Sequence, residues 1–296
     1  MPFSRRKTKS IRLRPQQHHP QSCGEKLANR WQDGLFLCVG LDSDYEQLPT
    51  HLHSAFPNVQ DSLFEFNRQI IVATARWVSA FKPNLAFYEQ SGLPGLMALK
   101  RTCDFLKKNY PDIPIILDAK RGDIGNTNRG YATSFFDYYG ADAVTVQPYL
   151  GREALVPFLS HSDKHIFVLC RTSNPGGAEI QKLLVEGEPL YLKIARLVQD
   201  DWNRLDNVGL VAGATYPEEI AAIRAVAPDL PLLIPGVGSQ GGDLVSALKN
   251  GLDRHGGGVI INSSRSIIYA SEGEDFAEAA GKEAEKVATE IRRIIG

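Results

Sequence analysis

The sequence predicts an α/β protein built as a single (β/α)8 barrel, the TIM-barrel fold. From about residue 30 onward, short apolar runs rich in Val, Ile and Leu alternate with polar or glycine-containing turns and longer amphipathic segments. The apolar runs are nearly continuous, which is typical of parallel strands buried on both faces. A chain of 296 residues is long enough for eight strand–helix units, which together need about 250 residues.

The strand candidates define the order of these units along the chain. They are residues 35–41, 79–82, 113–118, 143–147, 165–170, 208–212, 231–235 and 259–262. Amphipathic segments that fit crossover helices lie between them, among them residues 61–77, 96–109, 190–203, 217–226 and 243–249. A doubly wound open sheet is the alternative, but no G-x-G-x-x-G motif follows an early strand, as it does in dinucleotide-binding members of that class. We therefore expect the barrel to occupy residues 25–296.

Residues 1–24 differ from the rest of the chain in composition. They carry six basic residues and no acidic residue, although the whole chain has a net charge of -1. They also lack hydrophobic periodicity, so we interpret them as a disordered basic extension. An organelle transit segment and a weak contact with an anionic surface are the alternative interpretations. We expect no nucleic-acid partner.

The composition also argues against a membrane protein and a secreted protein. No apolar stretch approaches the roughly 18 residues of a membrane-spanning helix, and the N-terminal residues lack the apolar segment of a secretory signal. We therefore expect a cytoplasmic protein with no membrane partner. The four cysteines lie far apart and form no C-x-x-C pair, and three of them stand in apolar runs. This pattern favours buried reduced thiols over a disulfide or a metal site.

Ionisable residues follow the first three predicted strands, at the carboxyl ends where barrel enzymes carry their catalytic residues. Asp42 follows the first strand, Lys82 ends the second and Asp118 ends the third. A single charge at a strand end is usually a solvated residue or a helix cap. Lys82, however, has apolar neighbours on both sides, so we expect it to be buried and to need an anionic partner. Asp118 is the candidate for that partner.

The segment LDAKRGDIGNT (117–127) holds the densest group of charges in the chain. Asp118, Lys120 and Asp123 lie within six positions, directly after an apolar run. In an extended segment Asp118 and Lys120 point to the same side, because they are two residues apart. Charges of this density at the end of a buried strand indicate a function, and we interpret the three residues together as functional.

A glycine-rich segment and an arginine follow the last two predicted strands, where many barrels bind phosphate. The segment PGVGSQGGD (235–243) follows the seventh strand, and Arg265 follows the eighth. Small residues allow backbone N–H groups to approach phosphate oxygens, Arg265 offers a bidentate contact, and Gln240 offers a neutral donor. We predict a phosphate site here, and we expect the segment around 236–242 to form a mobile cover.

These motifs resemble those of the orotidine 5'-phosphate decarboxylase family, and in particular its longer type 2 subgroup. The matching segments are FKPNLAFYEQSG (81–92), LDAKRGDIGNT (117–127), VQPYLG (146–151), CRTSNPGG (170–177), PGVGSQGGD (235–243) and NSSRSI (262–267). The resemblance covers the chain from about residue 30 to the C-terminus. Only the N-terminal extension lies outside it.

The resemblance implies decarboxylation of orotidine 5'-phosphate (OMP) to UMP and CO2, the last step of de novo UMP biosynthesis, without a metal or other cofactor. It implies an array of charges around the reacting carboxylate, with Lys120 as the proton donor to C6 of the pyrimidine. The matching residues are Lys82, Asp118, Lys120 and Asp123. It further implies a homodimer in which Asp123 and Thr127 come from the partner subunit.

The same resemblance assigns substrate contacts to four further residues. Asp42 is expected to contact the ribose and Ser173 the edge of the pyrimidine. Gln240 and Arg265 are expected to bind the phosphate.

Two other functions are the alternatives. Sugar-phosphate decarboxylases and aldolases of the same barrel superfamily share a D-x-K-x-x-D element but use Mg²⁺; the additional Lys82 and the S-N-P-G sequence favour the nucleotide enzyme. A catalytically silent nucleotide-phosphate binder is the second alternative. The four charges of the array argue against it, because a protein that only binds has no use for charges that are costly to bury.

Overall fold

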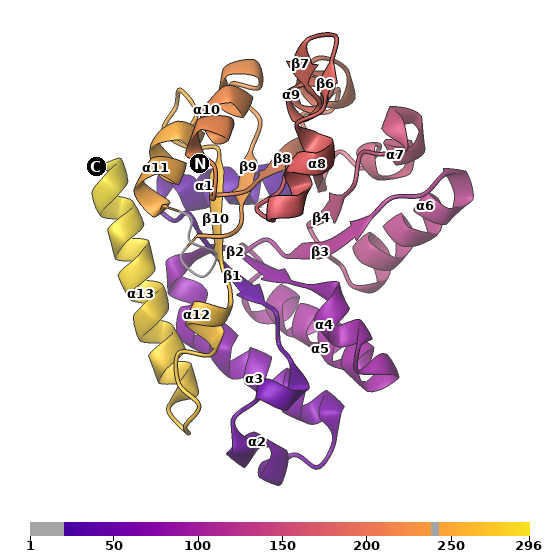
Figure 1. Cartoon of the computed structure of the whole chain (residues 1–296). Helices are drawn as coiled ribbons and strands as arrows, with labels where there is room; N and C mark the ends of the chain where they lie inside the picture. The colour runs from indigo at the N-terminus through magenta and orange to yellow at the C-terminus, as the bar shows by residue number, and fades with distance from the viewer. Residues whose placement is uncertain (1–20, 238–242) are drawn as a thin grey trace, which may run out of the picture.

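The computed structural model describes residues 21–237 and 243–296. Within these residues, eight parallel strands form one sheet in the order β2-β1-β10-β9-β8-β5-β4-β3 (Figure 1). The strands are β1 (Leu37–Leu41), β2 (Val78–Pro83), β3 (Ile116–Arg121), β4 (Ala143–Val146), β5 (His165–Arg171), β8 (Val208–Ala212), β9 (Leu232–Ile234) and β10 (Val259–Ser263). Parallel bridges from Phe81 to Ile115 and from Asn84 to Asp118 join β2 to β3 and close the barrel. The predicted TIM barrel is confirmed, and the open-sheet alternative is wrong.

Helices surround the barrel on its outer side (Figure 1). The longer ones are α3 (Val59–Thr74), α5 (Gly92–Asn109), α6 (Gly125–Ala132), α7 (Gly151–Leu159), α9 (Leu190–Leu197), α10 (Pro217–Val226), α11 (Leu244–Gly251) and α13 (Phe276–Ile295). Short helices stand in the connecting segments: α2 (Thr50–Ala55), α4 (Leu85–Glu89), α8 (Ala178–Gln181) and α12 (Arg265–Ile268). The five amphipathic segments named from the sequence all contain helices, with ends shifted by a few residues. None of the described helices combines the length and the apolar character that a membrane span requires.

The connection after β5 is longer than a simple crossover. It contains α8 and a two-stranded antiparallel hairpin, β6 (Leu184–Val185) and β7 (Glu188–Pro189), before α9 begins. The two turn residues of the hairpin, Glu186 and Gly187, both have positive φ angles, 54° and 82°. Such a pair is typical of tight hairpin turns. This insertion was not predicted from the sequence.

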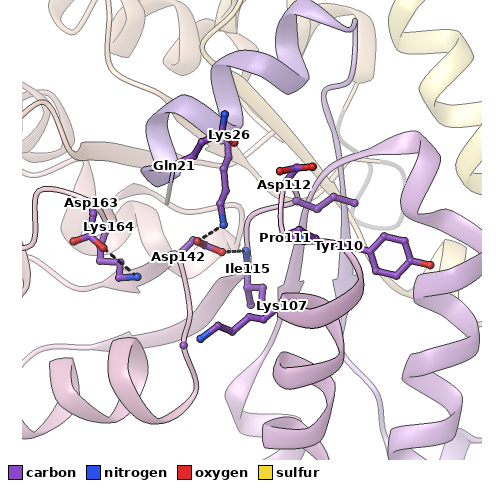
Figure 2. Close-up of a pocket in the computed structure, with 12 residues that line it drawn as sticks. Gln21, Lys26, Lys107, Tyr110, Pro111, Asp112, Ile115, Asp142, Asp163 and Lys164 are labelled. Atoms are coloured by element: carbon purple, nitrogen blue, oxygen red, sulfur yellow. Dashed lines mark hydrogen bonds and ion pairs between the residues drawn. The ribbon is translucent and has the colours of Figure 1, made fainter. Parts of the chain in front are cut away.

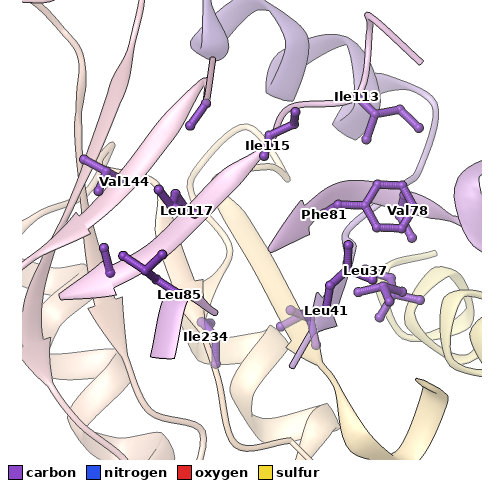
Figure 3. Packing of buried hydrophobic residues seen from close by; sticks show 14 of the residues in the cluster. Leu37, Leu41, Val78, Phe81, Leu85, Ile113, Ile115, Leu117, Val144 and Ile234 are labelled. Atoms are coloured by element: carbon purple, nitrogen blue, oxygen red, sulfur yellow. The ribbon is translucent and has the colours of Figure 1, made fainter. Parts of the chain in front are cut away.

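Alternation along the strands divides the buried side chains into two sets. One set forms an apolar layer inside the barrel: Cys38, Ala80, Ile116, Ala143, Phe167, Val211, Leu233 and Ile260. The other set packs between the strands and the helices, and Figure 3 shows Leu37, Val78, Phe81 and Leu117 among its members. Two positions beyond the inner apolar layer, several strands present polar residues instead: Lys82, Asp118, Thr145 and Asn262. The barrel interior therefore changes from apolar to polar towards the carboxyl ends of the strands.

Helix α1 (Cys23–Gln32) covers the amino end of the barrel. Cys23 and Leu27 are fully buried and pack with the inner apolar layer. Ser22 and Glu25 form a capping box that starts the helix. The boundary predicted at residue 25 therefore falls inside α1, which begins at Cys23. Residues 1–20 lie outside the described part of the chain.

Polar contacts fasten α1 to the strands below it. Lys26 Nζ pairs with Asp142 Oδ1 at 2.7 Å, and Asp142 Oδ2 accepts a hydrogen bond from the backbone N–H of Ile115 at 2.9 Å (Figure 2). Trp31 Nε1 donates to the carbonyl oxygen of Val259 at 2.8 Å. Because these contacts reach segments next to three different strands, α1 belongs to the barrel fold.

Candidate active site

A cavity of ≈ 340 Å³ opens at the carboxyl ends of the strands. Six of the residues predicted from the sequence line it: Asp42, Lys82, Asp118, Lys120, Ser173 and Arg265. A larger cavity of ≈ 650 Å³ lies at the amino ends (Figure 2). Its charges are largely committed to structural ion pairs, Lys26 with Asp142 and Lys164 with Asp163. We assign the active site to the smaller cavity, because the interior of the barrel turns polar there and barrel enzymes react at that end.

Asp118 is the centre of the charged group at the floor of the active-site cavity. Its Oδ2 lies 2.8 Å from Lys82 Nζ, and its Oδ1 lies 2.6 Å from Lys120 Nζ. The side chain of Lys82 is only 4% exposed, whereas that of Lys120 is 48% exposed. One carboxylate thus joins a buried ammonium group to an ammonium group that is accessible from the cavity.

The charges hold one another in their ionised forms. Burial alone lowers the pKa of Lys82, but the negative charges of Asp118 and Asp42 outweigh it and raise that pKa above its ordinary value. Burial alone raises the pKa of Asp118, but the charges of Lys82 and Lys120 outweigh it and hold that pKa well below its usual range. Lys82 and Asp118 therefore form a charged pair at neutral pH.

Thr145 of β4 supports this group, and it was not predicted as a site residue. Its hydroxyl donates to Asp118 Oδ1 at 2.9 Å and accepts the backbone N–H groups of Ala119 and Lys120, each at 3.0 Å. Lys120 has a φ of 48°, in the left-handed region that side chains rarely adopt. Backbone conformations of this kind concentrate at functional sites, where the surrounding contacts hold them. Threonine is common in strands, so nothing in the sequence around Thr145 indicated this role.

Two buried oxygen atoms at the edge of the site have no hydrogen-bond partner among the described residues. They are Oδ1 of Asp42 and Oδ1 of Asn262. Both residues line the cavity. A buried acceptor without a donor is costly, so these atoms are suited to accept hydrogen bonds from a ligand. Asn262 was not predicted as a site residue, although it opens the NSSRSI segment.

The predicted phosphate site is described only in part. Arg265 begins α12 and lines the cavity, and Gly236 lines it from the end of β9. Gln240 and the rest of segment 238–242 lie outside the described residues. The contact predicted for Gln240 and the cover predicted for 236–242 therefore stay predictions.

Asp123 and Thr127 do not line the cavity of their own chain. Asn128 accepts the backbone N–H of Asp123 at 2.9 Å and so holds the loop after β3. Oδ1 of Asp123 accepts from the backbone N–H of Ile124 at 2.7 Å. Thr127 is exposed. The single chain thus brings five of the predicted charged residues to one cavity, and Asp123 is the one that does not line it. The five are Asp42, Lys82, Asp118, Lys120 and Arg265.

The chain matches the family model described as "Orotidine 5'-phosphate decarboxylase / HUMPS family" over residues 36–280. The chain belongs to this family. An orotidine 5'-phosphate decarboxylase of Herpetosiphon aurantiacus is 53% identical over 250 residues, which is 84% of this chain and 90% of the relative. One from Azoarcus is 49% identical over 256 residues, which is 86% of this chain and 92% of the relative. The protein is therefore an orotidine 5'-phosphate decarboxylase and catalyses the final step of UMP biosynthesis.

The fold of this decarboxylase also agrees with a solved structure of the family. The structure of a putative orotidine-monophosphate-decarboxylase from Toxoplasma gondii has a TM-score of 0.81 and 40% sequence identity. The match covers 92% of this chain and 97% of that chain. Similarity over nearly the full length of both chains places the whole described barrel, and not only its motifs, within the family.

Proposed function

We propose that this decarboxylase works without a metal or organic cofactor and that Lys120 delivers the proton to C6 of the pyrimidine. The observation that carries the proposal is the carboxylate of Asp118 between the ammonium groups of Lys82 and Lys120. A carboxylate flanked by two cations is a poor ligand for a metal ion, because the cations repel it. The same arrangement is well suited to stabilise a carbanion.

The chemistry needs a positive charge at one carbon atom. When the bond to CO2 breaks, an electron pair remains at C6, and the pyrimidine ring delocalises it poorly. A preorganised ammonium group near that carbon stabilises the transition state and then supplies the proton. Lys120 is suited to stabilise the carbanion and to supply the proton, because it lines the cavity and its ammonium group is paired with Asp118.

Asp118 contributes in a second way. We propose that the substrate carboxylate lies close to it, so that two negative charges face each other in a partly dry cavity. Their repulsion is relieved as the departing carboxylate becomes neutral CO2. Lys82 keeps Asp118 ionised throughout, which the lowered pKa of Asp118 supports.

Substrate groups distant from C6 are assigned to the rim of the cavity. We propose that Asp42 accepts from a ribose hydroxyl, which its unpartnered Oδ1 supports. Ser173 is proposed to contact the pyrimidine edge, and Arg265 with Gln240 the phosphate. Binding energy from the phosphate would hold the carboxylate in its unfavourable position near Asp118.

The test of the metal-free mechanism is an absorbance assay with OMP and purified enzyme. We expect full turnover after dialysis against EDTA and no increase on addition of Mg²⁺. An activity that EDTA abolishes and Mg²⁺ restores would reject the metal-free mechanism and leave the assignment to the family untouched.

We also propose that the enzyme is a homodimer in which Asp123 and Thr127 complete the partner's site. Neither residue lines its own cavity, although both belong to the segment that carries Asp118 and Lys120. Ile124, beside Asp123, is 61% exposed, and Tyr149 in the next connecting segment is 87% exposed. Exposed apolar residues of this size next to an incomplete site support an interface at this edge of the barrel.

Mixing two inactive variants tests the shared site. Lys120→Ala and Asp123→Ala are each expected to be inactive, because each damages every site in its homodimer. Refolding them together should restore roughly a quarter of the wild-type activity, since half of the dimers are mixed and each of these carries one intact site. No recovery in the mixture, with mixed dimers verified by two different affinity tags, would contradict the proposal.

We propose a cytoplasmic location, as the sequence predicts. The four cysteines are buried and free, a state that suits a reducing compartment. Cell fractionation with an antibody against the chain tests this, and recovery of the full-length protein in an organelle would contradict it.

A further inference from the structure

A cluster of polar residues lies behind the wall of the cavity, at the end of β5. Arg171 is 1% exposed, and the register between β5 and β8 shifts next to it. Its Nε donates to Oε2 of Glu219, a residue of α10 that is also buried. The guanidinium carbon lies 4.4 Å from the ring centroid of Tyr216. Arg171 is therefore fixed on the outer side of the strand and does not line the cavity.

Gln181, the last residue of α8, connects this arginine to the cavity wall. Its Oε1 accepts the backbone N–H of Thr172 at 3.0 Å and Nη1 of Arg171 at 3.1 Å. Its Nε2 donates to the hydroxyl of Thr172 at 2.9 Å. Nη1 of Arg171 also donates to the carbonyl oxygen of Thr172 at 2.8 Å. The amide, the carbonyl and the hydroxyl of Thr172 are thus all engaged by two side chains.

Thr172, held in this way, in turn positions the residues that follow it. Its hydroxyl donates to Oδ1 of Asn174 at 2.6 Å. From the segment after β8, the hydroxyl of Thr215 donates to the carbonyl oxygen of Ser173 at 3.2 Å. Thr172, Ser173 and Asn174 all line the active-site cavity. The wall segment 172–174 is therefore held by Arg171, Gln181 and Thr215, which do not line the cavity.

The cluster closes only because residue 177 has no side chain. A Cβ atom on Gly177 would lie 2.7 Å from Oγ1 of Thr172, 2.9 Å from Oε1 of Gln181 and 3.1 Å from Nη1 of Arg171. Its φ of -57° suits any residue, so the backbone does not require glycine here. The neighbouring Gly176 has no atom closer than 3.8 Å to its own Cβ position. Gly177 is thus buried against the cluster, whereas Gly176 is exposed and has room for a methyl group.

We propose that Gln181, together with Gly177, is a positioning residue that sets recognition of the pyrimidine base through the wall segment 172–174. The inference rests on the proposed contact between Ser173 and the base. It assigns a role in base recognition to α8, which belongs to the insertion between β5 and α9. The residues act on the ligand only through Thr172 and its neighbours.

The experiment compares a nucleotide with a ligand that lacks the base. Inhibition constants of UMP and of ribose 5-phosphate against OMP turnover are measured for the wild type, Gln181→Ala, Gly177→Ala and the matched control Gly176→Ala. We expect Gln181→Ala and Gly177→Ala to weaken UMP about tenfold, the effect of losing one well-placed hydrogen bond. Ribose 5-phosphate inhibition should not change, and Gly176→Ala should behave as the wild type for both ligands.

Two further variants separate the possible outcomes. Gln181→Glu keeps the acceptor oxygen that Thr172 and Arg171 use, so its UMP inhibition should lie closer to the wild type than that of Gln181→Ala. Ser173→Ala should weaken UMP and not ribose 5-phosphate. A neutral Ser173→Ala would refute the proposed base contact and this inference with it. A selective effect of Ser173→Ala without one in Gln181→Ala, or an equal loss of both ligands in Gln181→Ala, would overturn the inference alone.

Discussion

The hydroxyl of Thr145 donates to Oδ1 of Asp118 at 2.9 Å and accepts the backbone N–H of Lys120 at 3.0 Å. One side chain from β4 thus orients a carboxylate and holds the backbone that carries the proposed proton donor. Lys120 Nζ contacts the same carboxylate oxygen at 2.6 Å. Lys120 is therefore held both at its backbone and at its ammonium group. The position of that ammonium group therefore depends on contacts from both β3 and β4.

Thr145→Val is expected to lower kcat about 10- to 100-fold, because two backbone N–H groups and one carboxylate oxygen lose a buried partner. Valine has nearly the same shape, so the barrel should remain folded. Steady-state kinetics with OMP measures the effect, and Thr145→Ser should restore most of it. An unchanged kcat in the valine variant would show that Asp118 and Lys120 are positioned without Thr145.

Lys120→Ala is expected to abolish turnover and leave UMP binding measurable. The substitution removes the proposed proton donor, whereas the ribose and phosphate contacts are assigned to other residues. Turnover is measured by OMP absorbance and UMP binding by titration calorimetry. Full activity in this variant would refute Lys120 as the proton donor.

Arg265→Ala is expected to weaken UMP binding about 10- to 100-fold, since hydrogen bonds to a charged group are worth about 1.5–3 kcal/mol. Uridine, which has no phosphate, is the control ligand and should bind the variant and the wild type equally. Unchanged affinity for UMP would count against a phosphate site at α12.

We expect the buried His165 to make the protein less stable in acid. It is buried, and burial lowers its pKa from 6.5 to about 4, with the charge of Asp206 opposing the shift. The unfolded chain binds the proton more readily, so stability is fully present above about pH 6.5 and is lost as the pH falls towards 4. The loss is at most about 3 kcal/mol.

His165→Leu should remove that part of the loss. The measurement is the free energy of unfolding in urea at pH 7.5 and at pH 4.5, for the variant and the wild type. The difference between the two pH values should be smaller in the variant. An equal difference in both proteins would mean that another group causes the loss.

Hydrophobic patterning predicted the barrel because each strand is a continuous apolar run. The patterning predicted the ends of the strands less accurately, because a strand can continue through polar residues after its apolar run ends. The third strand was predicted to end at Asp118, but β3 continues to Arg121 through the left-handed Lys120. The hairpin after β5 was missed because β6 and β7 have two residues each, too few for a periodic signal.

At the site, the charged residues and Ser173 were predicted, whereas Thr145 and Asn262 were not. Lys82, Asp118 and Lys120 stand out in sequence because charges rarely end an apolar strand. Thr145 and Gln181 do not, because their roles depend on neighbours from other strands and helices. Helix α1 could have been predicted, since Ser22 and Glu25 have capping-box spacing, but the basic composition of the preceding residues obscured it.

The φ of 48° at Lys120 reverses an ordinary rule of substitution. Elsewhere in regular structure alanine stabilises a chain relative to glycine, but in the left-handed region its Cβ meets the backbone at a cost of about 1–2 kcal/mol. The Lys120→Gly variant should therefore unfold at a higher temperature than Lys120→Ala, and both variants lack the proposed proton donor. Lysine at this position therefore costs the folded protein stability, a cost that the proposed role of Lys120 as proton donor would explain.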